Sequence, residues 1–296
     1  MPNFAILGAS GFVAPRHLRA IREAGGRLVA ATDPADPPAD TRALLGEACL
    51  FSEGARFWEH LESLRGGDRA DFVSICSPND LHEVQIRRAL AVGATVVCEK
   101  PLVLDPRALD GLEVAERAAE RRVFTVLQLR LHPRILAARE RLPARPPPGG
   151  HEVSLSFVTR RGPAYFASWK GIEARSGGLA MNIGVHYFDL LLWLFGAARG
   201  AAVLRRESGA LEGTLDLERA RVRWLLSVDE ARPPPGSAGV HRSLSVDGEQ
   251  VDFTGGTEDL HASVYREILA GRGTGIAEAR PSVELVDRIR RTVSKG

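Results

Sequence analysis

The stretch Asn3–Ala14, N-F-A-I-L-G-A-S-G-F-V-A, decides the fold of this chain. It begins with a short apolar strand candidate, Asn3–Leu7, and passes through a glycine turn into a helical pattern over Pro15–Ala24. A strand, a glycine turn and a helix in this order open a dinucleotide-binding fold, because the free amides and the helix N-terminus can receive a pyrophosphate. We therefore expect a cofactor site at this turn.

The turn departs from the usual G-x-G-x-x-G spacing. Counted from Gly8, the second glycine position holds Ser10 and the third holds Val13. Gly8, Gly11 and the small Ala14 instead give a loop that is one residue longer. The motif alone does not separate a cofactor loop from an ordinary strand-to-helix turn, so both interpretations remain open at this point.

An acidic residue follows the second predicted strand. The strand covers Arg27–Thr32, and Asp33 comes 22 residues after Gly11. An acid at this place accepts hydrogen bonds from the adenosine ribose hydroxyls and repels a 2′-phosphate, so it favours NAD over NADP. The alternative is a plain Asp-Pro turn with no ligand.

Further strands and helices alternate up to residue 91. Asp71–Cys76 is an apolar run without alternation, which is typical of a strand that is buried on both faces of a parallel sheet. Ser77-Pro78-Asn79-Asp80 then begins a helix with His82 in its first turn. Strand ends of this kind line a cofactor crevice, so His82 is either a cofactor contact or a solvated residue. The other elements expected here are helices at Thr41–Gly46 and Glu53–Leu64 and a short strand at Cys49–Phe51.

A charged pair stands at the end of the next buried strand, Ala94–Cys98. Glu99-Lys100-Pro101 follows it directly, before a helix over Asp105–Arg121. Burying a charged group costs free energy unless the group is paired with an opposite charge or has a function. Lys100 is therefore a candidate site residue. The alternative is an exposed loop lysine. Val123–Leu129, with Gln128 and Arg130 at its end, completes a doubly wound parallel sheet of the α/β class.

The pattern changes after a helix that begins at Pro133 and a proline-rich turn at Pro143–Gly150. Alternating strands and the hairpin turn Asp247-Gly248 predict a largely antiparallel sheet, with a helix over residues 184–195 packed on it. We divide the chain into a cofactor domain, 1–130, and an α+β substrate domain, 131–296. The expected strands are Glu152–Arg160, Arg199–Arg206, Leu211–Leu217, Ala220–Asp229, His241–Val246 and Gln250–Phe253, and the closing helices are Glu258–Leu269 and Pro281–Val293.

The stretch Gly177–Asp189 holds the polar residues that we expect to carry chemistry. Asn182 and His186 are four residues apart, and His186 and Asp189 are three apart. On one helix all three would share a face. The alternative is a buried helix with one hydrogen-bonded histidine.

Composition sets broad limits. The 296 residues are 44% hydrophobic and 26% charged, as in soluble globular proteins, and a net charge of +2 gives no reason to expect nucleic acid. With no apolar run of about 18 residues and no signal-type N-terminus, we expect a cytoplasmic protein and no membrane span. Cys49, Cys76 and Cys98 sit in apolar runs, so we expect buried thiols and no metal.

Taken together, the glycine turn, Glu99-Lys100-Pro101 and the Gly177–Asp189 stretch resemble the Gfo/Idh/MocA family of nicotinamide-dependent sugar oxidoreductases. Within it the chain is most similar to the WlbA-type UDP-N-acetyl-2-amino-2-deoxyglucuronate dehydrogenases. The finer resemblance rests on six stretches: Ala14–His17, Ser74–Asn79, Leu127–Arg130, Ser168–Gly171, Asn182–His186 and Ala220–Trp224.

The resemblance implies a role for many of these residues. Lys100 and His186 are the expected catalytic pair. Many family members carry aspartate where this chain has Asn182, and an amide cannot hold a proton for transfer, so Asn182 is expected to position substrate. The expected NAD contacts are Gly8, Ser10, Gly11, Phe12, Val13, Asp33, Ser77, Asn79, His82, Glu99, Lys100 and Gln128. The expected substrate contacts are Lys100, Arg160, Tyr165, Ser168, Trp169, Lys170, Asn182 and His186.

The resemblance also implies an activity: NAD-dependent oxidation of the C3 hydroxyl of a UDP-linked N-acetylated sugar uronic acid in surface polysaccharide biosynthesis. A 2-oxo acid such as 2-oxoglutarate would recycle the NADH, and the protein would be a homotetramer. Three alternatives remain open, namely another sugar or polyol dehydrogenase of the family, a glycosidase that uses NAD transiently, and a non-catalytic NAD-binding sensor.

Overall fold

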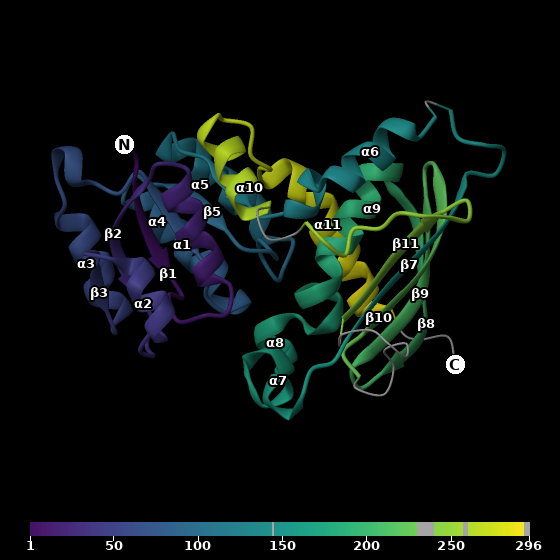
Figure 1. The fold of residues 1–296 in the computed structure, drawn as a ribbon, viewed down its shortest axis with the longest axis horizontal. Helices are drawn as coiled ribbons and strands as arrows, with labels where there is room; N and C mark the ends of the chain where they lie inside the picture. Colours follow the sequence, from purple (N-terminus) through teal and green to yellow (C-terminus); the bar gives the residue numbers. More distant parts are fainter. Residues whose placement is uncertain (144, 230–239, 257–259, 293–296) are drawn as a thin grey trace. The chain divides into compact units, whose positions relative to one another are not determined.

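The computed structural model describes residues 1–143, 145–229, 240–256 and 260–292 (Figure 1). The chain forms two compact units. Unit 1 contains Met1–Gln128 and His261–Ala279, and unit 2 contains Leu129–Leu260 and Arg280–Gly296. Each unit is built on its own six-stranded sheet.

The sheet of unit 1 is parallel throughout and has the order β3-β2-β1-β4-β5-β6. The strand order reverses between β1 and β4, and ligands of such sheets bind at the carboxyl ends of the strands at this reversal. The doubly wound α/β fold is therefore confirmed. The strands are β1 (Asn3–Leu7), β2 (Arg27–Thr32), β3 (Cys49–Phe51), β4 (Phe72–Ile75), β5 (Thr95–Cys98) and β6 (Val123–Thr125).

Unit 1 also contains a segment from late in the sequence. Tyr265 of this segment packs against Phe4 with ring centroids 5.7 Å apart, and Gly275 forms a bridge with Phe124. The sequence prediction assigned this segment to the second domain, whereas in the structure it forms part of the core of unit 1. The helices of unit 1 are α1 (Ala14–Glu23), α2 (Ala39–Leu45), α3 (Gly54–Ser63), α4 (His82–Ala91), α5 (Ala108–Ala119) and α10 (Leu260–Leu269), with short 3-10 turns η1 (Gly66–Asp68) and η2 (Asn79–Leu81).

Two local predictions in unit 1 are wrong. Cys49 is exposed, because β3 is the edge strand of the sheet, whereas Cys76 and Cys98 are buried as expected. The last predicted strand ends at Thr125, and Gln128–Leu131 is a 3-10 turn, η3. Gln128 therefore lies beyond the strand rather than at its end.

The sheet of unit 2 has the order β12-β11-β7-β10-β9-β8. Among the strand pairs of the described residues, β7–β10 is parallel and the other four are antiparallel, so the expected largely antiparallel sheet is confirmed. The hairpin strand β12 is shorter than the predicted Gln250–Phe253. The strands are β7 (His151–Thr159), β8 (Ala198–Glu207), β9 (Ala210–Leu217), β10 (Ala220–Ser227), β11 (Val240–Val246) and β12 (Glu249–Gln250).

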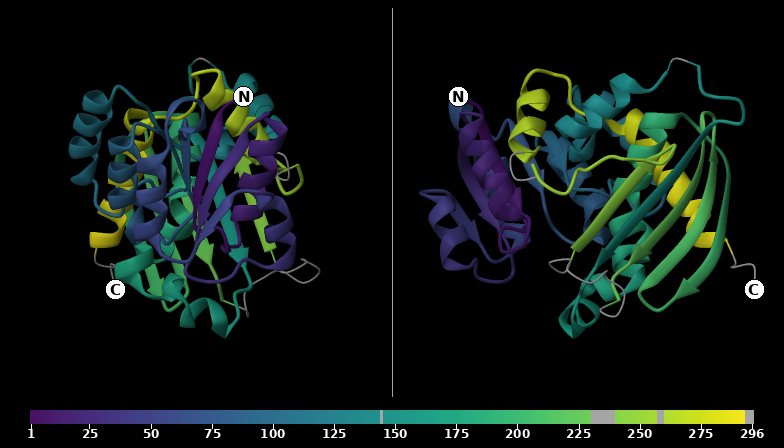
Figure 2. Two further views of the ribbon diagram at one scale, coloured as in Figure 1. Left: turned by 90° about the vertical axis from the view of Figure 1, so that its left-hand side faces the viewer. Right: turned by 45° about the vertical axis from the view of Figure 1, so that its right-hand side comes forward.

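Helices cover one face of this sheet, as the two views of unit 2 in Figures 1 and 2 show. The central helix α9 (Val185–Phe195) packs Phe188 edge-on against Trp224 of β10, with centroids 5.1 Å apart. The other helices are α6 (Pro133–Arg141), α7 (Pro163–Ala167), α8 (Glu173–Ser176) and α11 (Ile276–Arg291), with the 3-10 turn η4 (Trp169–Gly171) and the π-helical turn η5 (Ala180–Gly184). The predicted helix ends at Glu258 and Val293 lie outside the described residues.

The helical stretch Glu173–Phe195 is apolar enough, by length and composition, to cross a membrane. Two thirds of its most apolar window (67%) is buried inside the protein. Its apolar character is accounted for by packing against the sheet, as expected for a core helix.

Candidate functional site

The glycine turn of unit 1 is packed directly against the end of β4. Gly8 has φ +81°, and a Cβ at this position would lie 2.6 Å from the backbone of Cys76 and Ser77. Only glycine fits such a close backbone approach at a positive φ. The helix that follows has neither a side-chain cap nor an acidic residue in its first turn, so its N-terminal dipole remains available to an anion.

Asp33 and Ser10 are brought together beside this turn. The Asp33 carboxylate accepts hydrogen bonds from the backbone N–H groups of Ser10 at 3.0 Å and Ala35 at 2.9 Å. The Ser10 hydroxyl donates to the Ala35 carbonyl at 2.6 Å. These bonds fix the carboxylate next to the glycine turn, and each of its oxygens keeps a second lone pair for a hydroxyl donor.

The end of β4 supplies further predicted cofactor residues. Ser77 and Asn79 are buried, and the Ser77 hydroxyl donates to Gln85 at 2.5 Å. His82 is fully buried, with Nδ1 2.7 Å from the Pro101 carbonyl oxygen and Nε2 3.0 Å from that of Ser77. The alternative of a solvated His82 is therefore wrong. Burial lowers the pKa of His82, while the two carbonyls and Glu99 act in the opposite direction.

Glu99 and Lys100 differ strongly in their surroundings. Glu99 is buried, and its Oε1 lies 2.9 Å from His17 Nε2 and 3.2 Å from His261 Nε2. Burial raises the pKa of Glu99, but the hydrogen bonds from the two histidines prevail and hold it well below its usual value. Lys100, one residue later, is half-buried. Glu99, His17 and His261 offer three possible metal ligands within 4.8 Å, and the Nε2 atoms of both histidines are hydrogen-bonded directly to Glu99 Oε1.

The residues present fit a dinucleotide. The uncapped helix and Asp33 are two suitable features. A third is Gln128, whose side-chain oxygen is buried and accepts no hydrogen bond from the described residues. Such an acceptor suits an amide or hydroxyl donor of a ligand. Phe12 of the glycine turn is 75% exposed, and its ring, with the Arg16 guanidinium 5.5 Å from the centroid, can cover a bound group with its open face. Gly8, Gly11, Asp33 and Gln128 would hold NAD.

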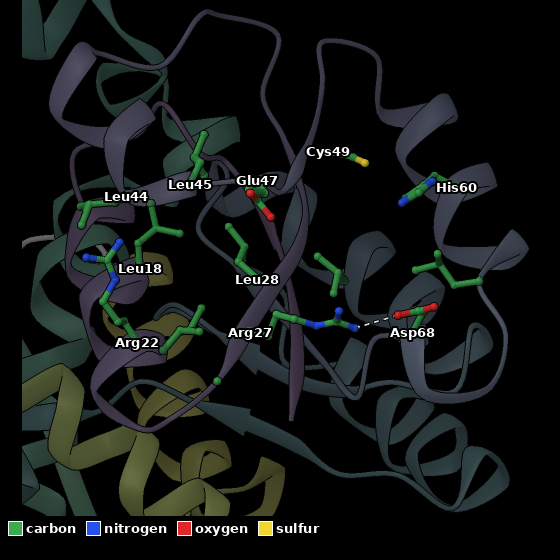
Figure 3. Close-up of a pocket in the computed structure, with 15 residues that line it drawn as sticks. Leu18, Arg22, Arg27, Leu28, Leu44, Leu45, Glu47, Cys49, His60 and Asp68 are labelled. Atoms are coloured by element: carbon green, nitrogen blue, oxygen red, sulfur yellow. Dashed lines mark hydrogen bonds and ion pairs between the residues drawn. The ribbon is translucent and has the colours of Figure 1, made fainter. Parts of the chain in front are cut away.

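The pocket drawn in Figure 3 lies elsewhere in unit 1. It is bounded by the amino end of β2, where Arg27 pairs with Asp68 at 2.9 Å, and by leucines of α1 and α2. None of the predicted site residues lines it. Because ligands of parallel sheets bind at the carboxyl ends of strands, this pocket is not the predicted cofactor site.

In unit 2 the predicted site residues begin at a π-helical turn. Asn182 lies in η5, and His186 lies in the first turn of α9, so the assumed regular helical spacing is wrong between them. Asn182 is buried and its amide donates to the Tyr165 hydroxyl at 3.0 Å. His186 is half-buried. A π-helical turn at this place is common at functional sites.

Asp189 does not join these residues chemically. It is 2% exposed and forms a two-pronged ion pair with Arg130, at 2.8 and 2.6 Å. Burial raises the pKa of Asp189, and Arg130 opposes this shift. The pair joins α9 to η3 and has a structural role in unit 2.

The loop before η5 contributes the other predicted substrate residues. Tyr165 and Lys170 line a pocket of unit 2 between this loop and the β8–β9 hairpin, together with Arg206 and Arg290. Burial, and secondarily Arg161, lowers the pKa of Lys170. Ser168 caps η4 through its hydroxyl, Trp169 lies under the Lys170 ammonium at 5.7 Å, and Arg160 is exposed.

Sequence reasoning missed several residues of these environments. His17 and His261 bond to Glu99, and Tyr265 bonds to His17, although α1 and α10 are far apart in the sequence. Arg206, which donates to carbonyls at the end of α11, and Arg290 border the pocket of unit 2. Their charge was visible, but nothing in the local sequence placed them next to the loop 163–180.

Comparison with known proteins identifies related folds and families. Residues 2–127 match the Gfo/Idh/MocA oxidoreductase family model, described as an NAD-binding Rossmann fold, and residues 151–231 match the model of its C-terminal alpha/beta domain. Among curated proteins, inositol 2-dehydrogenase of Rhizobium meliloti is 28% identical over 197 residues, which cover 66% of this chain. The chain spans about half the length of that relative, 55%.

Solved structures resemble the chain over its whole length. The WlbA (WbpB) dehydrogenase of Thermus thermophilus, solved with NAD and UDP-GlcNAcA, is 46% identical with a TM-score of 0.95, covering 100% of this chain and 96% of that one. The WlbA dehydrogenase of Bordetella pertussis is 21% identical, with a TM-score of 0.78 and coverage of 98% and 95%, and shows the fold alone. This chain therefore belongs to the Gfo/Idh/MocA family of NAD-binding oxidoreductases.

Proposed function

We propose that this protein is an NAD-dependent dehydrogenase that oxidises the C3 hydroxyl of a UDP-linked N-acetylated sugar uronic acid, UDP-GlcNAcA. The observation that carries the proposal is the 46% identity, over the full chain, to a dehydrogenase solved with NAD and UDP-GlcNAcA. The family is one of oxidoreductases, which supports hydride transfer as the reaction class.

Three side chains of this chain then have separate roles in the reaction. When bound, NAD accepts the hydride from the carbon that bears the hydroxyl. His186 removes the hydroxyl proton, because imidazole is the side chain whose ordinary pKa lies closest to neutral pH. Lys100 donates a hydrogen bond to the developing alkoxide and stabilises its charge. Asn182, which cannot transfer a proton, orients the sugar through its amide.

The substrate is a polyanion, with a diphosphate and a carboxylate. The loop that follows β7 offers donors for such groups in Arg160, Tyr165, Ser168, Trp169 and Lys170. Lys170 and Tyr165 border the pocket of unit 2 and are partly buried, which strengthens charge-assisted hydrogen bonds relative to those in water. We assign the anion-binding role to this loop.

The cofactor contacts follow the predicted set. Gly8, Ser10, Gly11, Phe12 and Val13 are proposed to receive the pyrophosphate at the start of α1, and Asp33 the adenosine ribose. The remaining contacts are proposed to be Ser77, Asn79, His82, Glu99, Lys100 and Gln128. We propose a cofactor domain, 1–130, and a substrate domain, 131–296, as the functional division of the sequence, with the segment His261–Ala279 of the second part packed into unit 1.

We also propose that 2-oxoglutarate reoxidises the NADH in place. A second structure of the Thermus thermophilus WlbA dehydrogenase, with NAD and alpha-ketoglutarate, is 46% identical to this chain with a TM-score of 0.94, covering 100% of it and 97% of that chain. The product, a 3-keto nucleotide sugar, fits a cytoplasmic enzyme of surface polysaccharide biosynthesis.

A homotetramer is proposed on the basis of the exposed face of the sheet in unit 2. Arg221 of β10 pairs in register with Glu152 of β7 and with Asp216 of β9, and all three are exposed. A surface with alternating charges is complementary to a second copy of itself, as a twofold interface requires, and the proposed tetramer would add a second interface between two such pairs. Light scattering of the purified protein at several concentrations measures the assembly directly.

The experiment that tests the activity uses purified protein with its bound cofactor identified by mass spectrometry. UDP-N-acetylglucosaminuronate is added with and without 2-oxoglutarate, and NADH absorbance and the sugar product are followed. We expect a 3-keto product, with 2-oxoglutarate increasing the number of turnovers. Loss of about 10²- to 10⁴-fold in turnover is expected for Lys100→Met and for His186→Ala. No 3-keto product with either addition contradicts the proposal.

A further inference from the structure

Three buried histidines of unit 1 contact the two residues on either side of Lys100. His17 and His82 are 0% exposed and His261 is 2% exposed. We propose that this histidine set, His17, His82 and His261, positions the catalytic Lys100 by fixing Glu99 before it and Pro101 after it. The inference rests on the proposed role of Lys100.

Glu99 is fixed from two separate helices. His17 lies on α1 and His261 on α10, and each has Nε2 within 3.2 Å of the same carboxylate oxygen, Oε1 of Glu99. A carboxylate only accepts hydrogen bonds, so both Nε2 atoms carry protons and donate to it. Two donors on one oxygen hold the Glu99 side chain in a single position, because a rotation would break both bonds.

The ring of His17 is fixed in turn by a chain of hydroxyl groups. With Nε2 protonated, the neutral His17 ring accepts at Nδ1 from the Tyr265 hydroxyl, 2.8 Å away. The Tyr265 hydroxyl accepts from the Ser74 hydroxyl of β4, at 2.7 Å. Every polar group of this chain is satisfied while His17 stays neutral, which agrees with the pKa of His17 being lowered by burial.

Pro101, which follows Lys100 in the sequence, is held by His82. His82, the first residue of α4, bridges the carbonyl oxygens of Pro101 and Ser77 at 2.7 and 3.0 Å. The neutral ring donates to one of these carbonyls and the charged ring donates to both. In either state His82 lies between the loop after β4 and the loop after β5.

The consequence for Lys100 follows from its place in the chain. Its two sequence neighbours are anchored to three different helices, α1, α4 and α10, so its backbone cannot move independently of the core of unit 1. Its own side chain is half-buried and extends from this fixed backbone. A misplacement of about 1 Å at a reacting group can reduce a rate about 10²-fold, so anchoring of this kind contributes to turnover.

Charges around the set are few. Glu99 and Lys100 face His82, Glu99, His261 and Arg16 face His17, and the buried thiols of Cys76 and Cys98 lie near Glu99. Removing a histidine therefore alters the surroundings of Lys100 as well as its backbone. A change in the pH profile of turnover is expected in addition to a lower rate.

The test uses the NAD-loaded enzyme with UDP-N-acetylglucosaminuronate. His82→Phe and His261→Phe remove the hydrogen bonds and keep an aromatic ring. We expect kcat to fall about 10- to 100-fold and the pH profile of kcat/KM to shift in both variants. For His261→Phe, whose position is not among the proposed NAD contacts, the affinity for NAD should change less than about 3-fold. His151→Phe in unit 2 is the matched control, since His151 is also buried and bonded to a carboxylate, Asp247, at 2.7 Å. It should leave kcat and the pH profile unchanged.

Conservative variants keep the test decisive if a phenylalanine variant does not fold. His82→Gln and His261→Gln each retain an N–H donor, so their kcat should be higher than that of the phenylalanine variants. If the phenylalanine variants do not fold, the kcat of each glutamine variant should be about 3- to 10-fold below that of the wild type. Wild-type kcat and pH profile in all folded variants of the set would overturn the inference. If Lys100→Met retains wild-type turnover, the proposed catalytic site fails; if only the histidine variants do, the site stands and the positioning role fails.

Discussion

Each unit has one buried carboxylate close in sequence to a proposed catalytic residue. Glu99 immediately precedes Lys100 in unit 1, and Asp189 follows His186 by three residues on α9 in unit 2. Glu99 accepts from two histidines, whereas Asp189 accepts from the guanidinium of Arg130. The same task of satisfying a buried carboxylate is therefore met by titratable partners in one unit and by a permanent cation in the other.

The difference has a physical consequence. An arginine stays charged at any pH at which the protein is folded, so Arg130 remains a cation beside Asp189 throughout that range. His17, whose pKa is lowered by burial, donates as a neutral ring and brings no net positive charge. Glu99 therefore keeps its negative charge one residue from Lys100. The negative charge of Asp189 is balanced by Arg130 and does not act on His186.

The largest loss of stability is expected when the ion pair between Arg130 and Asp189 is broken. Arg130→Met leaves the carboxylate of Asp189 buried without its cation, since Asp189 is 2% exposed. Breaking a buried pair on one side typically costs about 3–5 kcal/mol of unfolding free energy. Urea unfolding of the variant and the wild type measures the cost.

The control is the double variant Arg130→Met, Asp189→Leu. Replacing both partners of a buried pair by apolar residues is often nearly neutral, so most of the stability should return. If the double variant is no more stable than Arg130→Met, the cost arises from lost packing of the arginine and not from the uncompensated charge.

The sequence was sufficient to predict the framework that carries these carboxylates. Glycine turns, buried strands without alternation and the late alternating strands are local patterns, and the parallel sheet and the mostly antiparallel sheet followed from them. Lys100 at the end of β5 could also be found, because a charged pair after an apolar run is visible in the sequence itself.

The partners of those carboxylates could not be found in this way. His17 and Glu99 are 82 residues apart, and His261 and Glu99 are 162 apart, so only tertiary packing brings them together. His186 and Asp189 do lie three residues apart on α9, but Asn182 was expected on the same face because a uniform helix was assumed for all three. The π-helical turn and the salt bridge to Arg130 depend on neighbours that the local pattern does not contain.

Alanine substitutions at Gly8 and Gly184 compare the rigidity of the glycine turn in unit 1 with that of the turn before α9 in unit 2. Gly8 in unit 1 has φ +81° and faces backbone atoms at 2.6 Å, so Gly8→Ala should cost at least about 1–3 kcal/mol. Gly184 in unit 2 has a helical φ of −64° and faces side-chain atoms of Leu226 and Phe188 at 2.7 Å, which can shift. Gly184→Ala should cost less, because alanine favours the helix by about 1 kcal/mol. Thermal unfolding of both variants compares them, and equal losses would contradict the proposed difference in rigidity.

Acid should affect the two carboxylates in opposite directions. The pKa of Glu99 is lowered in the folded protein, so its contribution to stability is present above its unfolded pKa and is lost as pH falls through the folded value. The pKa of Asp189 is raised, so its contribution is present at low pH and is lost as pH rises through the folded value.

Unfolding free energies between pH 3 and pH 6 would separate these contributions. Relative to wild type, the cost of Glu99→Gln should shrink as pH falls, and the cost of Asp189→Asn should grow. Parallel curves for the two variants would mean that the buried carboxylates do not differ in the way that their partners suggest.

The smallest effect is expected where a histidine meets a carboxylate at the surface. His151 pairs with Asp247 at 2.7 Å in unit 2, and the hydrogen bond to His151 lowers the pKa of Asp247, but the Asp247 side chain is 47% exposed. Water screens such a pair, so Asp247→Asn should change the unfolding free energy by less than about 1 kcal/mol. Asparagine also suits the positive φ of 53° at this turn, which leaves the backbone unstrained. A loss as large as that of Glu99→Gln, measured by urea unfolding at pH 7, would show that burial is not what separates the Glu99 pairing from an ordinary histidine–carboxylate contact.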